Sequence, residues 1–224
     1  MMDAFTMTGI TKKIQNGEVQ ESLLKGVSLT LKKGEITALT GASGSGKSTL
    51  LTIAAGLQPS SEGTIHFNGE QVSGMSQEEL RALRASSFGF VFQAAHLVPF
   101  LNVADQLTLM LKVSGVKMKK IERDDRVQEL LEAVGMTHRK DAYPASLSGG
   151  EKQRVAIARA VIHQPEVLFA DEPTASLDSV KSNEVMTLIR DLTKDRQITT
   201  LMVTHDQDML SYADRIVTMK DGVI

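Results

Sequence analysis

Two segments of the chain combine residue types and spacings that suit phosphate chemistry. The first is GASGSGKS at residues 41–48, whose three glycines free backbone N–H groups to face phosphate oxygens. Lys47 would add a positive charge, and the Ser48 hydroxyl is a ligand that Mg²⁺ accepts. A strand-like run precedes this segment and a helix-like run follows it, so a simple glycine turn is the weaker interpretation. The segment therefore predicts a loop that binds the phosphates of a nucleotide, a P-loop.

The second segment is VLFADE at residues 167–172, an apolar run that ends in two carboxylates. Asp171 would hold Mg²⁺ through its water shell, and Glu172 would orient or deprotonate an attacking water. Taken alone, the pair could equally be solvated acids at the end of a strand. Together with a P-loop, it predicts hydrolysis of the bound nucleotide.

Two further polar residues, Gln93 and His205, each follow a strand-like apolar run. His205 could donate to a γ-phosphate, and Gln93 could reach the metal ion or the water. Either residue alone could be a cap or a turn former. Ligands of open parallel sheets bind beyond the carboxyl ends of the strands, so we expect both residues at the sheet edge that also carries Gly41 and Glu172.

LSGGEKQ at residues 147–153 places two glycines at the start of a helix-like run. Ser148 and Glu151 have the spacing of a capping box, so the helix should begin at Gly149 with N–H groups of its first turn free. Simple capping would explain these two residues. Glycine at two successive first-turn positions is costly unless something approaches closely, so the segment predicts a second anion site.

The surrounding sequence predicts the elements that position these residues. Strand patterns and an Asn-Gly turn signal fill much of the first third, and helical periodicity dominates residues 94–163 before strands and helices alternate again. This pattern favours an α/β core with a mostly β region and an inserted helical subdomain. The expected parts are 1–93 (β subdomain and P-loop core), 94–163 (helical subdomain with LSGGE) and 164–224 (the remainder of the core). The expected elements are strands 28–31, 34–41, 63–70, 88–92, 166–172, 198–206 and 215–222, and helices 46–55, 103–115, 125–135 and 179–195.

Composition bounds the class of protein. The chain has 224 residues, 25 basic against 27 acidic, a net charge of −2 and no cysteine. It offers no electrostatic reason to expect nucleic acid as a partner, and it can form neither a disulfide nor a thiolate metal site. No apolar run approaches the roughly 20 residues of a spanning helix. We expect a soluble cytoplasmic chain that would need a separate subunit for any membrane function.

The order of these motifs resembles that of the ATP-binding cassette (ABC) ATPases over nearly the whole chain. Six motifs occur here in the order that the family shows. They are the P-loop, the Q-loop Gln93, the signature LSGGE, VLFADE, the D-loop SLD at 176–178 and the switch residue His205. The resemblance implies a P-loop NTPase (RecA-like) core with an antiparallel β subdomain, and a head-to-tail dimer in which one chain's signature closes over ATP on its partner. It implies that Glu172, His205 and Gln93 are catalytic and that Ser48, Gln93 and Asp171 hold Mg²⁺. The implied ATP contacts are Ile14, Gly41, Ala42, Ser43, Gly44, Ser45, Gly46, Lys47, Ser48, Thr49, Ser148, Gly149, Gly150, Glu151 and Asp178.

Two longer stretches, YPASLSGGEKQRVAIARA and FQAAHLVPFLNVADQL, are similar to ATPases of mechanotransmission-type exporters, and the second is closest to bacterial haem-export ATPases. This implies a peripheral subunit on the cytoplasmic face of the cell membrane, bound through the segment after Gln93 to an integral membrane permease. An exporter of lipoproteins, peptides or macrolides, or a mechanical coupler resembling the cell-division ABC ATPase, is the alternative.

One position departs from the family pattern. An aromatic residue on which adenine stacks usually precedes the P-loop, and the aligned residue here is Ile14. Either an apolar contact replaces base stacking, or Phe5 is the aromatic partner.

Overall fold

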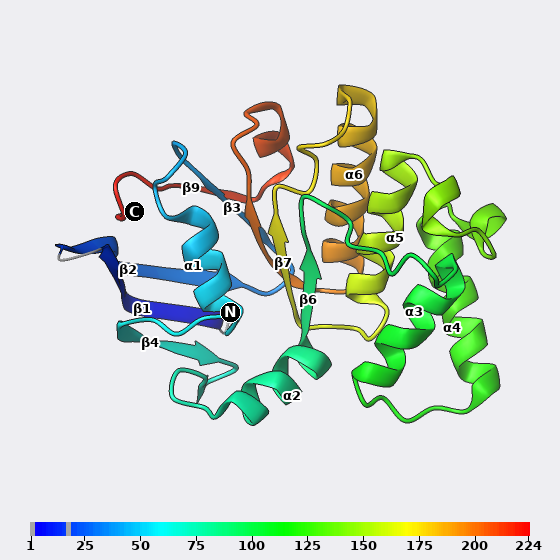
Figure 1. The fold of residues 1–224 in the computed structure, drawn as a ribbon, viewed down its shortest axis with the longest axis horizontal. Coiled ribbons are helices and arrows are strands. Elements are labelled where there is room, and N and C mark those ends of the chain that lie inside the picture. The colour runs from blue at the N-terminus through cyan, green and yellow to red at the C-terminus, as the bar shows by residue number, and fades with distance from the viewer. Residues whose placement is uncertain (1–2, 17–18) are drawn as a thin grey trace.

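The computed structural model describes residues 3–16 and 19–224. Two sheets lie side by side, with helices on their flanks (Figure 1). The antiparallel sheet lies at the left of the view, the parallel sheet occupies the centre, and most of the helices gather at the right. The predicted α/β fold is confirmed.

The antiparallel sheet has the strand order β2-β1-β4-β5. Its strands are β1 (Asp3–Asn16), β2 (Val19–Lys32), β4 (Glu62–Phe67) and β5 (Glu70–Gln71). Asn68 and Gly69 join β4 to β5 with φ values of 50° and 84°, the left-handed pair that a tight hairpin turn needs. The turn predicted from Asn-Gly is therefore confirmed, whereas β1 was not among the expected strands.

The parallel sheet has the order β6-β7-β8-β3-β9, and each of its neighbouring pairs is parallel. Its strands are β3 (Ile36–Thr40), β6 (Phe88–Val91), β7 (Val167–Asp171), β8 (Thr199–Val203) and β9 (Arg215–Thr218). Strands β3 and β8 are buried along their whole length, as expected for a sheet covered on both faces. All five carboxyl ends meet at one edge, where the P-loop, Glu172 and His205 follow their strands.

Six α-helices surround the sheets in the described part of the chain. They are α1 (Lys47–Ala54), α2 (Gln77–Ser87), α3 (Val103–Val113), α4 (Lys120–Ala133), α5 (Gly149–Val161) and α6 (Ser179–Asp195). Short 3-10 helices cover Thr137–Arg139, Pro144–Ser146 and Asp208–Tyr212. Helix α2 was not predicted individually. Helix α4 begins earlier than expected, because the Glu122 carboxylate accepts the Lys119 N–H at 2.8 Å and caps its start. The expected helix 179–195 is confirmed to the residue.

Two hydrophobic clusters hold these layers together. In the first, Leu107 of α3, Leu130 of α4 and Ile157 of α5 share one core with Leu168 of β7. The second lies between the antiparallel sheet, α1 and the other side of the parallel sheet. Its centre is an aromatic group with ring centroids 5.3 to 6.2 Å apart, made of Phe5, Phe67, Phe88 and Phe169. None of the helices in residues 3–16 and 19–224 is long and apolar enough to cross a membrane.

Candidate functional site

The P-loop connects β3 to α1 and turns on three left-handed glycines. Gly41, Gly44 and Gly46 have φ values of 142°, 79° and 102°. A Cβ on Gly41 would lie 2.0 Å from the Met219 carbonyl oxygen, whereas a Cβ on Gly44 would meet nothing within 4 Å. Gly46 is the N-cap of α1 and brings no side-chain cap. The first N–H groups of the helix are therefore left for an anion, and the open face of Gly44 provides room for it.

Lys47 is buried at the mouth of this loop. Its Nζ donates to the carbonyl oxygens of Gly41 and Ala42, both at 2.8 Å, and the residue is 8% exposed. An ammonium group has three donor hydrogens, so a third remains for a phosphate oxygen. The loop fits a polyphosphate in backbone geometry and in charge.

Ser48 and Asp171 meet beside the P-loop. The Ser48 hydroxyl donates to Asp171 Oδ1 at 3.2 Å. Burial raises the pKa of the Asp171 carboxyl, opposed by the Ser48 hydrogen bond and the Lys47 charge. A hydroxyl next to a half-buried carboxylate is a donor set that suits Mg²⁺, and a cation there would stabilise the charged form of Asp171.

Glu172 and His205 form a pair at the same sheet edge. Glu172 has a left-handed φ of 49°, and its N–H donates to the Val203 carbonyl at 3.0 Å. Its Oε1 lies 2.7 Å from His205 Nδ1, a contact that raises the pKa of the imidazole through the hydrogen bond and the adjacent negative charge. The unusual backbone turn thus aims the carboxylate across the end of β8, where His205 fixes it.

These residues enclose a cleft of about 670 Å³. It is lined by Leu23, Gly41, Ala42, Ser43, Gly44, Gly46, Lys47, Ser48, Thr49, Glu172 and His205. Most of the predicted P-loop residues, Glu172 and His205 therefore come together. Ser45 lies behind the lining, 5% exposed, with a buried hydroxyl that has no partner among the described residues. Leu23 of β2 was missed, because no local pattern distinguishes this leucine from its apolar neighbours.

Gln93 lies past the end of β6, exposed and outside the lining of this cleft. Helix α5 holds the chain on both sides of it. Gln153 Nε2 donates to the Phe92 carbonyl at 3.0 Å, and Arg159 donates to the carbonyls of Ala95 and His96 at 2.8 and 2.7 Å. The position of Gln93 is thus tied to the helix that begins at LSGGE.

The start of α5 has the predicted geometry. Ser148 is its N-cap, the Ser148 hydroxyl accepts the Glu151 N–H at 3.3 Å, and Glu151 Oε2 accepts the Ser148 N–H at 2.7 Å. Arg139 Nε also donates to Glu151, at 2.9 Å. The Ser148 N–H and Arg139 together lower the pKa of the Glu151 carboxyl. The capping box and the helix start at Gly149 are confirmed.

The two glycines of this helix have different explanations. A Cβ on Gly150 would lie 3.0 Å from Lys181 Cδ, so packing within the chain already favours glycine there. A Cβ on Gly149 would meet only Leu177, at an ordinary 3.6 Å. Packing within the chain therefore accounts for glycine at 150 but not at 149, where the approach of something from outside the chain stays a prediction. Within the described residues, none of 147–151 lines the P-loop cleft.

The remaining predicted contacts lie away from the cleft. Ile14 sits in β1 opposite Glu21, half-buried, and does not line the cleft. Asp178 caps α6 by accepting the Lys181 N–H at 3.0 Å. The alternative that Phe5 stacks on adenine is wrong, because Phe5 is 0% exposed within the aromatic core.

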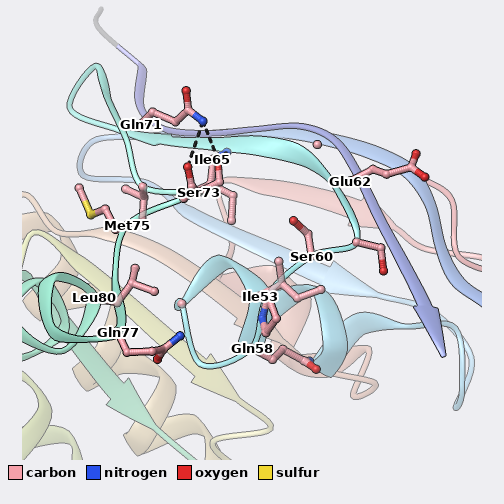
Figure 2. A pocket seen from close by; sticks show the side chains of 16 residues that line it. Ile53, Gln58, Ser60, Glu62, Ile65, Gln71, Ser73, Met75, Gln77 and Leu80 are labelled. Carbon is pink, nitrogen blue, oxygen red and sulfur yellow. Dashed lines mark hydrogen bonds between the residues drawn. The ribbon is translucent and has the colours of Figure 1, made fainter. Parts of the chain in front are cut away.

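A second cavity of about 400 Å³ lies beyond the C-terminal end of α1 and carries none of these motifs (Figure 2). Two of its polar side chains, those of Gln71 and Ser73, bond to each other. Gln71 donates to the Ser73 carbonyl and hydroxyl at 3.0 and 3.3 Å, and the Ser73 hydroxyl accepts the Ile65 N–H at 3.1 Å. Among the described residues that line this cavity, the one charged side chain is that of Glu62, which is exposed and paired with Lys13. The titratable groups that suit phosphate chemistry therefore lie at the P-loop cleft.

Comparison with known proteins agrees with this geometry. A family model described as ABC transporter matches residues 24–175. The chain is 43% identical over 221 residues, 99% of each chain, to the "Putative hemin import ATP-binding protein HrtA" of Staphylococcus haemolyticus. The protein of the same name from Staphylococcus aureus strain Newman is 42% identical over the same shares.

Solved structures share the fold. A dimeric post-hydrolysis state of the ATP-binding cassette MJ0796 bound to ADP and Pi matches with a TM-score of 0.89 and 35% identity, covering 98% of this chain and 96% of that one. CbiO1 from Clostridium perfringens, part of the transporter complex cbiONQ, matches with a TM-score of 0.87 and 33% identity, covering 98% and 86%. The predicted P-loop NTPase core is thereby confirmed.

Proposed function

Because the chain belongs to the ABC transporter family of ATP-binding proteins and is an ATPase, we propose that it powers the export of haem through a partner permease. Haem is proposed as the transported substrate because the chain is 42–43% identical, over nearly its whole length, to relatives named as putative hemin import ATP-binding proteins. Outward transport is our inference from the similarity to mechanotransmission-type exporters. The chain would then lie on the cytoplasmic face of the cell membrane.

In the proposed reaction, water attacks the γ-phosphate of ATP bound at the P-loop. Lys47 and the first N–H groups of α1 neutralise and orient the phosphates. Glu172 orients the water and accepts its proton, while His205, 2.7 Å from that carboxylate, fixes its position and faces the transferred phosphoryl group. Mg²⁺ held by Ser48 and Asp171 would supply charge neutralisation between the phosphates. Gln93 would join this site only after the segment that carries it moves inward.

We further propose that two copies complete each other's sites head to tail. Residues 147–151 do not line their own chain's cleft, yet the start of α5 offers free N–H groups and a glycine, Gly149, that internal packing does not require. A phosphate on a partner chain suits this position. The structural relative MJ0796 is dimeric in its state bound to ADP and Pi, which supports dimer formation by this chain.

The permease is proposed to bind at an apolar groove of about 340 Å³ between α2, β6, α3 and α5. Phe90, Phe92, Met110 and Val113 supply its apolar walls, next to the segment that carries Gln93. Arg81, Arg84, Arg159 and His163 also line it, and among the described residues no Asp or Glu does. A permease segment with apolar and acidic side chains would fit this surface.

The test is transport by the purified complex. The chain is isolated from detergent-solubilised membranes with its co-purifying permease and reconstituted into proteoliposomes with the ATPase facing outward. Export predicts that hemin added outside accumulates in the lumen when ATP is supplied, and that Glu172→Gln abolishes the accumulation. ATP-dependent loss of hemin from preloaded vesicles would show import instead of export. ATP turnover without any hemin movement would favour a lipoprotein, peptide or macrolide exporter, or a mechanical coupler.

A further inference from the structure

The loop 176–178 and the start of α5 are packed against each other within one chain. Leu177 Cδ2 lies 3.6 Å from where a Cβ on Gly149 would be. Lys181, in the first turn of α6, places its Cδ and Cγ at 3.0 and 3.4 Å from the corresponding position on Gly150. The aliphatic stem of Lys181 therefore packs on Gly150, and a Cβ at this position would require the lysine side chain to shift.

The ammonium of Lys181 is bound to the residue that caps its own helix. Nζ lies 2.5 Å from Asp178 Oδ2, and the backbone N–H of Lys181 donates to Asp178 Oδ1 at 3.0 Å. Lys181 therefore contacts Asp178 through its ammonium group and Gly150 through its aliphatic stem. Both partners are about half exposed, with side-chain exposures of 47% for Lys181 and 54% for Asp178. The pair remains accessible to an approaching chain.

A second carboxylate near the start of α5 is paired in the same way. Glu151 Oε1 lies 2.9 Å from Arg139 Nε and 3.9 Å from His138 Nε2. An anion site built on a helix N-terminus is weakened by an unpaired carboxylate beside it, because like charges repel. Here each of the two carboxylates is matched by a cation from the same chain.

We propose that Lys181 is a positioning residue of the composite ATP site. It masks the charge of Asp178 and holds the loop 176–178 against the start of α5, so that this loop and the helix start can together receive the partner's triphosphate. The proposal rests on the head-to-tail dimer proposed above. Lys181 acts through Asp178 and Gly150, and no contact between Lys181 and ATP is assumed.

The experiment measures ATP-driven dimerisation in a Glu172→Gln background, by light scattering over a range of protein concentrations. Lys181→Met retains an unbranched stem over Gly150 but removes the charge. We expect it to raise the dimer dissociation constant about three- to fivefold at low salt, as suits an exposed ion pair, and less at high salt. Lys181→Arg should restore the parent value. ATP affinity of the monomer and the melting temperature should change little.

A double-mutant cycle separates masking of charge from packing. In an Asp178→Asn chain, which retains a good N-cap, Lys181→Met should have almost no further effect on dimerisation. An equal effect in both backgrounds, or failure of Lys181→Arg to restore dimerisation, would overturn the proposal.

Lys120→Met, at an exposed position in the first turn of α4, is the matched control and should dimerise like the parent. If the parent itself stays monomeric with ATP, the dimer proposal fails. If the parent dimerises and Lys181→Met dimerises equally well, only the role of Lys181 is wrong.

Discussion

Glu172 has a backbone conformation that residues other than glycine rarely adopt. Its φ of 49° is held by the hydrogen bond from its N–H to Val203, and its carboxylate is held by His205. Unusual backbone conformations of this kind concentrate at functional sites, where the surrounding structure sustains them. The sequence motif locates this residue at the end of a strand, but it does not reveal the turn that aims the side chain.

Replacing Glu172 by Gln tests whether this carboxylate is the general base. Glutamine keeps the size and a hydrogen bond to His205 but cannot accept a proton from water. We expect ATP binding to persist and turnover to fall by at least about a hundredfold, a typical contribution of general base catalysis. Single-turnover measurements with radiolabelled ATP check this. Hydrolysis at close to the wild-type rate would assign the role to another group.

Ile14 and Leu23 give competing positions for adenine. If the base lies against Ile14, Ile14→Tyr adds a stacking surface, and the Kd for ATP should fall about three- to tenfold, while Ile14→Leu should leave it nearly unchanged. Fluorescence titration with ATP measures both. An unchanged or weaker affinity in Ile14→Tyr, together with weaker binding in Leu23→Ala, would place adenine against the Leu23 wall of the cleft instead.

His163 makes the stability of the chain depend on pH. Its imidazole is 4% exposed, Nε2 lies 3.1 Å from the Phe88 carbonyl, and Nδ1 has no partner among the described residues. Burial lowers the pKa of His163, opposed by the Phe88 hydrogen bond and assisted by the nearby Arg126. The unfolded chain therefore binds a proton at a higher pH than the folded chain does, and stability falls as the pH drops below about 6.5.

We expect His163→Gln to remove this component. Between pH 7.5 and 5.5, the variant should lose less unfolding free energy than the wild type, by up to ~1 kcal/mol per pH unit below the unfolded pKa. Urea unfolding at the two pH values measures the difference. His66→Gln, which removes a half-buried imidazole of β4, is the control. Equal losses in wild type and His163→Gln would contradict the assignment.

At the scale of elements, the P-loop is braced by the far end of the sequence. Met219 places its carbonyl against Gly41 and donates its N–H to the Thr40 carbonyl at 2.7 Å, while Gly222 donates its N–H to the Ser45 carbonyl at 3.2 Å. The segment after β9 thus fixes the backbone of the loop from behind. A phosphate-binding loop with this support needs less rearrangement to hold its ligand.

Two alanine substitutions separate the contact with Met219 from the cost of a left-handed backbone alone. Gly41→Ala adds the clash of a Cβ with the Met219 carbonyl to the strain of a left-handed backbone, and the two together should cost about 3 kcal/mol or more in unfolding free energy. Gly44→Ala has only the left-handed backbone to oppose it and should cost about 1 kcal/mol. Thermal and urea unfolding compare the two. Similar losses would mean that the segment after β9 does not brace the loop.

The elements and the positions of the motifs were largely predictable from the sequence, because strand ends, glycine loops and caps are encoded locally. Helix α6 and the capping box of α5 are examples. The reason for glycine at 150 and the part played by Leu23 were not, because each depends on a neighbour distant in sequence. Strand β1 was missed as well, although it pairs with the adjacent β2 and also with β4. The three-part division at 94–163 stays a prediction, and α3, α4 and α5 share a core with the parallel sheet.

At the scale of the whole molecule, the head-to-tail arrangement predicts which defects complement. A linked dimer with Lys47→Ala in one half and Ser148→Arg in the other keeps one complete composite site, so about half of the wild-type ATPase activity is expected. A linked dimer with both defects in the same half keeps no complete site and should be inactive. Activity in the second dimer and none in the first would show that each chain uses its own signature.

Helix α5 also has a mechanical property. Near its C-terminal end, Arg159 grips the carbonyls of Ala95 and His96, and at its N-terminus stands Ser148. The rise of an α-helix separates these two positions by roughly 16 Å, so a rigid tilt of about 10° about Arg159 displaces Ser148 by roughly 3 Å. Such a displacement is the length of a hydrogen bond. In the proposed head-to-tail dimer, a small shift imposed on the chain beside Gln93 and transmitted by a rigid α5 would be enough to make or break contact between Ser148 and the partner's phosphate.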